Sequence, residues 1–211
     1  MTAIKPIYLP ARLFASIPWW IEAIKGDCVH IGGIGRWNKR DKLTHRYEIA
    51  DVRGRLALTV PVSRSKDTGE GGMRQMLLSS HGDWWHVHRV TLESAYGRTP
   101  FFEHYFPNLA MFFDAGVVGR FSGLCRYIEA VTAKIMALLG QPAKVELSDD
   151  SPTVEIDDYL ALPEYYQVRR EQLGFIGGLS ILDLLFNLGP EALLYLRSLA
   201  GLQPDGRPWA G

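Results

Sequence analysis

The stretch DWWHVHRVTLESAYG, residues 83–97, decides where this 211-residue chain turns from strands to helices. Within it one stripe repeats at every fourth position, at Trp84, His88, Leu92 and Tyr96. Residues at this spacing lie on the same face of an α-helix. Asp83 is a typical N-cap residue and Gly97 a typical helix end. The stretch therefore predicts a helix that ends at about Tyr96 and buries the stripe.

On the carboxyl side of this stretch the pattern remains helical. Helices are expected over Phe101–Phe113 and Phe121–Leu139, and from Ile181, with Ser180 as N-cap and a second helix starting at Pro190. One short strand is expected at Val145–Leu147, followed by an acidic loop over residues 149–158.

The amino-terminal third is rich in predicted strands. Lys5–Pro10 and Cys28–Ile31 are short apolar runs, separated by a candidate helix at Phe14–Ile24. Tyr47–Ala50 and Arg55–Val62 flank a glycine-containing turn and predict a β-hairpin. The chain is therefore expected to be an α+β protein, in which a β-rich amino-terminal third with a hairpin packs against a mainly helical remainder.

Composition and charge narrow the function. The hydrophobic fraction of 47% and the absence of internal repeats favour one globular domain over residues 1–211. The formal net charge of +0 argues against a nucleic-acid partner, although the basic stretch 36–46 suits a small anionic ligand. No apolar run reaches the length of a membrane span, and the first residues lack a signal-peptide pattern. We therefore expect a cytoplasmic protein with a small-molecule substrate and an undefined oligomeric state.

The sequence lacks the motifs of several common kinds of active site. No phosphate-binding glycine loop and no nucleophile elbow is present, and the sequence leaves the cofactor unknown. His81, His86 and His88 are close in sequence, but on a helix His86 and His88 point in different directions, so no metal site is predicted. Cys28 reads as part of a buried strand, and Cys125 reads as a structural helix residue rather than a nucleophile.

The stripe itself offers two interpretations. His88 is either a core histidine with a satisfied hydrogen bond, which the residues alone favour, or a general base. Glu93 is either the carboxylate that orients His88 or a solvated helix residue. Asp183, within the apolar run 181–186, either caps a helix start or is functional, as an acid or as a group that orients His88.

Four segments carry a resemblance to a known family. They are the stripe with Leu92-Glu93-Ser94-Ala95-Tyr96-Gly97, Pro100-Phe101-Phe102 and Tyr105; the run 179–187 with Gly189, Glu191 and Ala192; the strand 58–62; and Tyr8-Leu9-Pro10 with Phe14. In these segments the chain resembles the WbqC-like family of bacterial surface-polysaccharide gene clusters. It departs from the family at Arg40, His45 and Arg46, where a lysine-containing stretch ending in Asn-Arg is usual. It departs again at Gly177-Gly178, where Pro-Asn is usual.

The resemblance implies a protein of O-antigen or related glycan biosynthesis. The expected activity is acyl or aminoacyl transfer onto an activated amino-sugar, with His88 as base, Glu93 or Asp183 as its partner, and Tyr96 as donor. Arg40 and Arg46 are expected to hold a carboxylate or diphosphate, and Trp84 and Asn187 to contact the substrate. The alternative is a non-catalytic binding or assembly protein. The two differ in whether His88, Tyr96 and Asp183 surround one pocket or lie in dry core.

Overall fold

The chain's strands lie mainly in its amino-terminal part and its helices mainly in its carboxyl-terminal part. A computed structural model describes residues 5–66, 72–141 and 143–207. The strands are β1 (Pro6–Pro10), β2 (Cys28–Gly32), β3 (Arg46–Asp51), β4 (Gly54–Thr59), β5 (Val62–Arg64), β6 (Met76–Leu78) and β7 (Lys144–Leu147). The α-helices are α1 (Ile17–Ala23), α2 (Trp84–Tyr96), α3 (Phe102–Leu109), α4 (Val117–Phe121), α5 (Leu124–Leu138), α6 (Arg170–Leu173), α7 (Ile181–Leu188) and α8 (Ala192–Leu199). This distribution confirms the α+β prediction.

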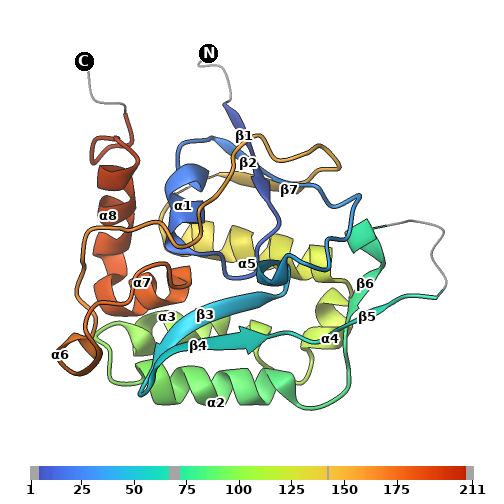
Figure 1. Cartoon of the computed structure of the whole chain (residues 1–211), viewed down its shortest axis with the longest axis horizontal. Helices are drawn as coiled ribbons and strands as arrows, with labels where there is room; N and C mark the ends of the chain where they lie inside the picture. The colour runs from blue at the N-terminus through green and yellow to red at the C-terminus, as the bar shows by residue number, and fades with distance from the viewer. Residues whose placement is uncertain (1–4, 67–71, 142, 208–211) are drawn as a thin grey trace.

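Three strands form a parallel sheet in the order β1-β2-β7 (Figure 1). Parallel neighbours need a crossover connection, and α1 joins β1 to β2 while α5 precedes β7. The register places Tyr8 beside His30, and His30 beside Glu146. The carboxyl ends of all three strands therefore lie at one edge of the sheet.

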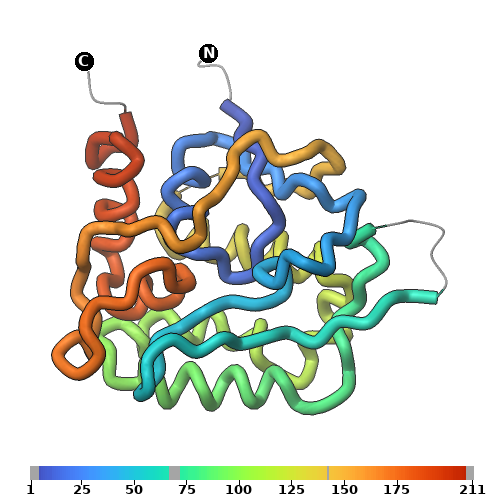
Figure 2. The backbone as a smooth tube through the Cα atoms, in the orientation of Figure 1, coloured from blue at the N-terminus to red at the C-terminus, as the bar shows by residue number. Residues whose placement is uncertain are grey.

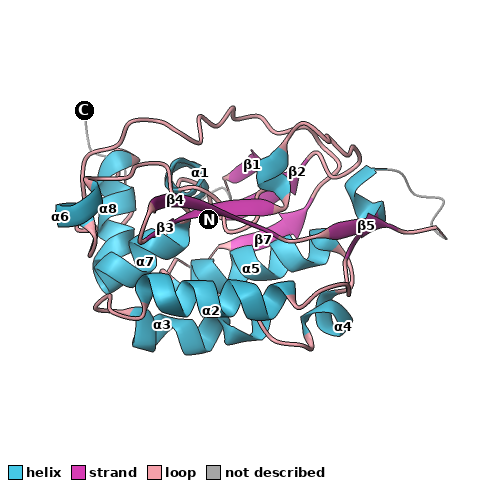
Figure 3. Cartoon of the chain, turned by 60° about the horizontal axis from the view of Figure 1, so that its bottom comes forward, coloured by secondary structure: helices cyan, strands magenta, loops and turns pink. Residues whose placement is uncertain are grey.

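The predicted hairpin is confirmed as β3 and β4, which pair antiparallel from Arg46 with Thr59 to Asp51 with Gly54. Gly54, at the end of the turn, has a φ of 115°, a conformation that favours glycine. A second small antiparallel pair joins β5 to β6. In Figure 3 the helices α2, α3 and α5 gather on one side of the strands.

The helix predicted from the opening stretch is α2, and all four residues of its stripe are buried. Asp83 takes the N-cap position, although its side chain makes no capping hydrogen bond. Ser180 does cap α7, since its hydroxyl accepts from the Leu182 N–H at 3.3 Å. None of the described helices is long and apolar enough to span a bilayer.

Some element boundaries differ from the prediction. The first helix begins at Ile17 rather than Phe14, because Phe14 has a φ of 42° and Pro18 must lie in the first turn of a helix. The helix predicted over 101–113 continues past α3 only as a 3₁₀ turn at Ala110–Phe112. The short α6 was not predicted. The polar, glycine-containing stretch 65–72 is expected from its sequence to be a loop, and its positions 67–71 lie outside the described residues.

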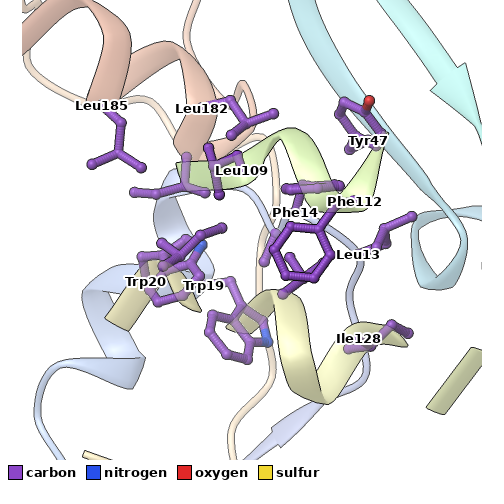
Figure 4. Packing of buried hydrophobic residues seen from close by; sticks show 14 of the residues in the cluster. Leu13, Phe14, Trp19, Trp20, Tyr47, Leu109, Phe112, Ile128, Leu182 and Leu185 are labelled. Atoms are coloured by element: carbon purple, nitrogen blue, oxygen red, sulfur yellow. The ribbon is translucent and has the colours of Figure 1, made fainter. Parts of the chain in front are cut away.

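One hydrophobic cluster joins the layers. Phe14 packs on Tyr47 of β3 and stacks on Phe113 at a ring distance of 5.3 Å. Trp19 and Trp20 of α1 are each 1% exposed and pack in the same cluster as Ile128 of α5 and Leu182 of α7 (Figure 4). Burial of such large side chains contributes about 1.5–3 kcal/mol each, so this cluster holds the hairpin, the parallel sheet and the helices together.

The segment after β7 crosses the carboxyl edge of the parallel sheet. The Gly33 N–H donates to the Asp150 carbonyl at 2.7 Å, and the Thr153 N–H donates to the Tyr8 carbonyl at 3.0 Å. The segment then runs on to α6 and α7, as the orange part of the tube in Figure 2 shows. It thereby forms one wall of the space at the ends of the strands.

Candidate functional site

Tyr96 and Asp183, two of the predicted catalytic residues, meet in the interior. They lie on α2 and α7, and the Tyr96 hydroxyl donates to Asp183 Oδ1 at 2.9 Å. The same hydroxyl accepts from the Ala50 N–H of β3 at 3.1 Å. Both side chains are 1% exposed. The contact ties the hairpin, α2 and α7 together.

The other carboxylate oxygen of Asp183, Oδ2, accepts hydrogen bonds from residues that precede α6. It accepts from the Tyr165 hydroxyl at 2.5 Å and from Gln167 Nε2 at 2.9 Å. Burial raises the pKa of Asp183, while the hydrogen bonds from Tyr165, Gln167 and Tyr96 lower it. A buried carboxyl group with three donors is well satisfied, and it anchors the irregular segment around residue 165.

Asn187, predicted to bind substrate, belongs to the same network. Its Nδ2 donates to the Asp183 carbonyl at 2.8 Å, one helical turn earlier, and its Oδ1 accepts from the Val168 N–H at 3.0 Å. The cavity between these groups has a volume of about 10 Å³. A cavity of this size holds about one water molecule, so it is too small for a sugar.

His88 lies apart from Asp183. Its Nδ1 is 3.1 Å from the Tyr47 hydroxyl, and its ring also bonds the Thr59 backbone. The side chain is 3% exposed, and burial lowers its pKa from 6.5 to about 4 despite the opposing hydrogen bond to Thr59. The imidazole is therefore neutral near pH 7, and its hydrogen bonds are directed at the hairpin.

The remaining predicted residues on α2 do not approach Asp183. Trp84 packs edge-on against His88, and its indole donates to the Ser79 carbonyl at 2.9 Å. Glu93 is on the surface and pairs with Arg89 at 2.8 Å, one helical turn earlier. Of the predicted catalytic set, the structure brings together Tyr96 and Asp183 and leaves His88 and Glu93 elsewhere.

The two arginines that were predicted to bind an anion have different surroundings. Arg46 Nε donates to Thr59 Oγ1 across the hairpin at 2.8 Å. Arg40 is exposed, on the loop that leads from β2 to β3. Arg46 lines a cavity of about 10 Å³ beside Arg12, whereas Arg40 belongs to a loop from which Arg36, Trp37, Asn38 and Asp41 line a much larger space.

That larger space is a cleft of about 480 Å³ at the carboxyl ends of the parallel strands. Pro10 and Gly32, the last residues of β1 and β2, line it together with the loop 36–41 and the segment after β7. Its polar and aromatic lining includes Arg12, Arg36, Trp37, Asn38, Asp41 and Asp149. Ligands of parallel sheets bind at this edge, because the loops that follow the strands converge there.

Arg12 is the most constrained charge in the cleft. Its Nη1 lies 2.5 Å from Asp41 Oδ2 and its Nε lies 3.3 Å from Asp158 Oδ2. Asp158 in turn accepts from the Ser16 hydroxyl at 2.6 Å. The Arg12 side chain is 11% exposed, so carboxylates from two other loops hold it in one place, and part of its surface is open to the cleft.

The loop after β2, which lines one side of the cleft, is basic. The exposed cations on the loop after β2 are Arg36, Lys39, Arg40 and Lys42, against one carboxylate at Asp41. Behind them, the ring of His45 lies 5.6 Å from Trp37, and burial, Lys42 and Arg46 lower the pKa of His45. The lining itself carries Asp41 and Asp149 beside Arg12 and Arg36, so the excess of positive charge comes from the other exposed cations of the loop. That excess favours an anionic ligand.

Arg12, Asp41 and Asp158 were missed by the sequence analysis. Arg12 follows the first predicted strand by two residues, which is a signal for a site only if that strand is part of a parallel sheet. The pairing that makes it so, with β2 and β7, joins segments far apart in the chain. Asp158 lies in the acidic loop, where nothing distinguishes it from its neighbours.

Metal ligands gather at a different place. His81 and His86 are exposed and His88 is buried, so these three do not form a site. Among the described residues, one group of metal-ligand side chains has its atoms within reach of one ion: Cys28, His30 and Glu146. These residues lie on β2 and β7 and outside the lining of the cleft.

Comparison with known proteins gives a family. A model described as the WbqC-like protein family matches residues 36–157, which is more than half of the chain and includes the basic loop, the hairpin, α2 and β7. No curated protein and no solved structure matches.

Proposed function

Because the chain belongs to the WbqC-like protein family, we propose that it acts in the biosynthesis of a bacterial surface polysaccharide. Its role there is to bind an anionic sugar precursor, such as a nucleotide-activated amino-sugar, in the cleft. The observation that carries this proposal is the 480 Å³ cleft at the ends of three parallel strands, with Arg12 fixed in its wall.

The lining suits the parts of such a ligand. Arg12 is already paired with Asp41 and Asp158, so it supplies a fixed hydrogen-bonding surface more than net charge. Arg36, which lines the cleft, and the exposed Arg40 of the same loop supply the charge that a diphosphate needs. Trp37 offers an apolar ring against which a sugar or base can pack.

We further propose that the protein transfers an acyl or aminoacyl group onto the amino-sugar. This reaction is supported by the family resemblance. The attacking amine must lose a proton to a base. His88, as it lies in the structure, does not line the cleft and its bonds go to Tyr47 and the Thr59 backbone. A catalytic His88 therefore requires α2 to separate from the hairpin, whereas binding in the cleft requires no rearrangement.

The test is calorimetric titration of the protein with a panel of nucleoside-diphosphate sugars, with the free nucleoside diphosphates alongside. Wild type is expected to bind at least one of them with one site per chain. Arg36→Ala is expected to weaken that binding about tenfold, which corresponds to about 1.4 kcal/mol. Salt is expected to weaken it further, because the attraction is partly between exposed charges.

The matched control is Arg53→Ala, which removes another exposed arginine, at the tip of the hairpin. It should bind as wild type does. Failure of every compound in the panel to bind, or an equal loss in both arginine variants, contradicts the assignment of the cleft.

A further inference from the structure

A thiol, an imidazole and a carboxylate meet on one face of the parallel sheet. Cys28 and His30 are two residues apart on β2, so their side chains lie on the same face. Glu146 of β7 stands directly beside His30 in the strand register. Neither the cleft nor the buried network around Asp183 includes these three residues.

The distances between the three groups are close to those of a metal site. Cys28 Sγ lies 3.4 Å from His30 Nε2 and 3.8 Å from Glu146 Oε2, and His30 Nδ1 lies 3.9 Å from the same oxygen. One ligand atom from each residue lies within 4.8 Å of the other two. Bonds of about 2.0–2.3 Å to a tetrahedral zinc place ligand atoms roughly 3.3–3.8 Å apart. One ion takes only one of the two His30 ring nitrogens, and Nε2 is the nitrogen that contacts the thiol. The side chains therefore have to rotate to bring all three ligand atoms to that spacing.

Neighbouring side chains orient two of the three groups. The Tyr8 ring of β1 stacks on the His30 imidazole, with centroids 4.5 Å apart and planes at 11°. Lys144 Nζ lies 2.5 Å from Glu146 Oε1, which leaves Oε2 as the oxygen nearer to Cys28 and His30. Outer contacts of this kind fix the orientation of metal ligands.

Exposure increases from the thiol to the carboxylate. Cys28 is 7% exposed, whereas the side chains of His30 and Glu146 are 19% and 39% exposed. His30 and Glu146 line an open hollow of about 510 Å³ on the surface, together with Tyr8, Arg74, Arg126 and Ser148. An ion at the cluster therefore has protein on one side and the hollow on the other.

We propose that Cys28, His30 and Glu146 bind a zinc-class divalent transition metal and leave one coordination position open toward this hollow. Thiolate and imidazole ligands favour zinc over magnesium or calcium. Thiolate and carboxylate together neutralise the two positive charges of the ion. Three protein ligands with an open fourth position are typical of zinc sites that bind or activate a small molecule, whereas structural zinc sites have four protein ligands.

The test uses the full chain, freed of metal by chelation and titrated with Co²⁺, whose bond to a thiolate gives a charge-transfer absorption band. Wild type is expected to take up one equivalent with this band, and Zn²⁺ is expected to displace it. Cys28→Ser should abolish the band. His30→Gln and Glu146→Gln should each lower the affinity for Zn²⁺ at least tenfold in competition with a chromophoric chelator.

The chain offers matched controls, since Cys125 is its other cysteine and lies on α5, and His86 is an exposed histidine on α2. Cys125→Ala and His86→Gln should titrate as wild type does. The partly exposed Glu146→Gln keeps the test decisive even if Cys28→Ser does not fold. Absence of metal uptake by folded wild type, or a band that survives in Cys28→Ser, overturns the site. Either result leaves the cleft and its titration unaffected.

Discussion

Tyr165 and Tyr166 are adjacent in the sequence, yet they have opposite environments. Tyr165 is 5% exposed and its hydroxyl donates to Asp183, whereas Tyr166 is 55% exposed. Tyr165→Phe is expected to lower the free energy of unfolding by about 1–3 kcal/mol, because Asp183 and Gln167 lose a buried partner. Urea unfolding followed by circular dichroism measures this change.

Tyr166→Phe removes the same atom from the neighbouring position and should change stability by less than about 0.5 kcal/mol. Two variants of equal stability would show that the Asp183 network contributes little to folding. That result would contradict a structural role for the hydrogen bonds to Asp183 and would favour a catalytic role for this residue.

At the scale of elements, α7 ends because of one glycine. Gly189 has a φ of 54°, and a Cβ built there would lie 2.5 Å from the Phe101 ring. Gly189 also has a ψ of −123°, so it lies outside the regions that residues with a Cβ adopt. Gly189→Ala is therefore expected to combine backbone strain of about 1–3 kcal/mol with a clash against Phe101. The ring belongs to the turn before α3, so the packing of α3 on α7 should weaken as well.

Gly201 is a suitable comparison, since it has a φ of 68° and nothing within 4 Å of a built Cβ. Gly201→Ala should show the strain of a positive φ without any steric clash. We expect Gly189→Ala to be the less stable of the two by about 1–3 kcal/mol, the usual range for an overpacked site. Thermal melts of both variants measure the difference, and equal melting temperatures would mean that Phe101 moves aside freely.

At the scale of the whole molecule, His88 links stability to pH. Burial lowers its pKa from 6.5 to about 4, so between these values the unfolded chain binds a proton that the folded chain does not. Stability is then complete above about pH 6.5 and falls as the pH drops towards 4, by up to roughly 3 kcal/mol. Urea unfolding at a series of pH values measures this slope.

His88→Gln should flatten the slope, and His86→Gln, on the exposed face of the same helix, should leave it unchanged. Burial also lowers the pKa of His45, so part of the slope is expected to remain in the His88 variant. A slope that His88→Gln does not alter contradicts the buried, neutral state of His88.

The sequence named some members of the interior network but not others. Tyr96 belongs to a stripe with helical spacing, and Asp183 interrupts an apolar run, so both were visible as unusual positions. Their partners Tyr165 and Gln167 lie in a segment without helix or strand, where no periodicity marks a buried residue. The cleft could not be predicted in the same way, because loops that are far apart in the sequence form it.

The sequence by itself determined the local elements of this protein: the stripe of α2, the Ser180 cap, the β3–β4 hairpin and the α+β class. These elements follow from interactions between residues a few positions apart, so both interacting residues can be recognised in one short stretch of sequence. Only the tertiary structure decided the β1-β2-β7 order, the cleft beside Arg12, and the meeting of Cys28 and His30 with Glu146. Each of these depends on which distant segments pair in parallel, and local patterns do not specify that pairing.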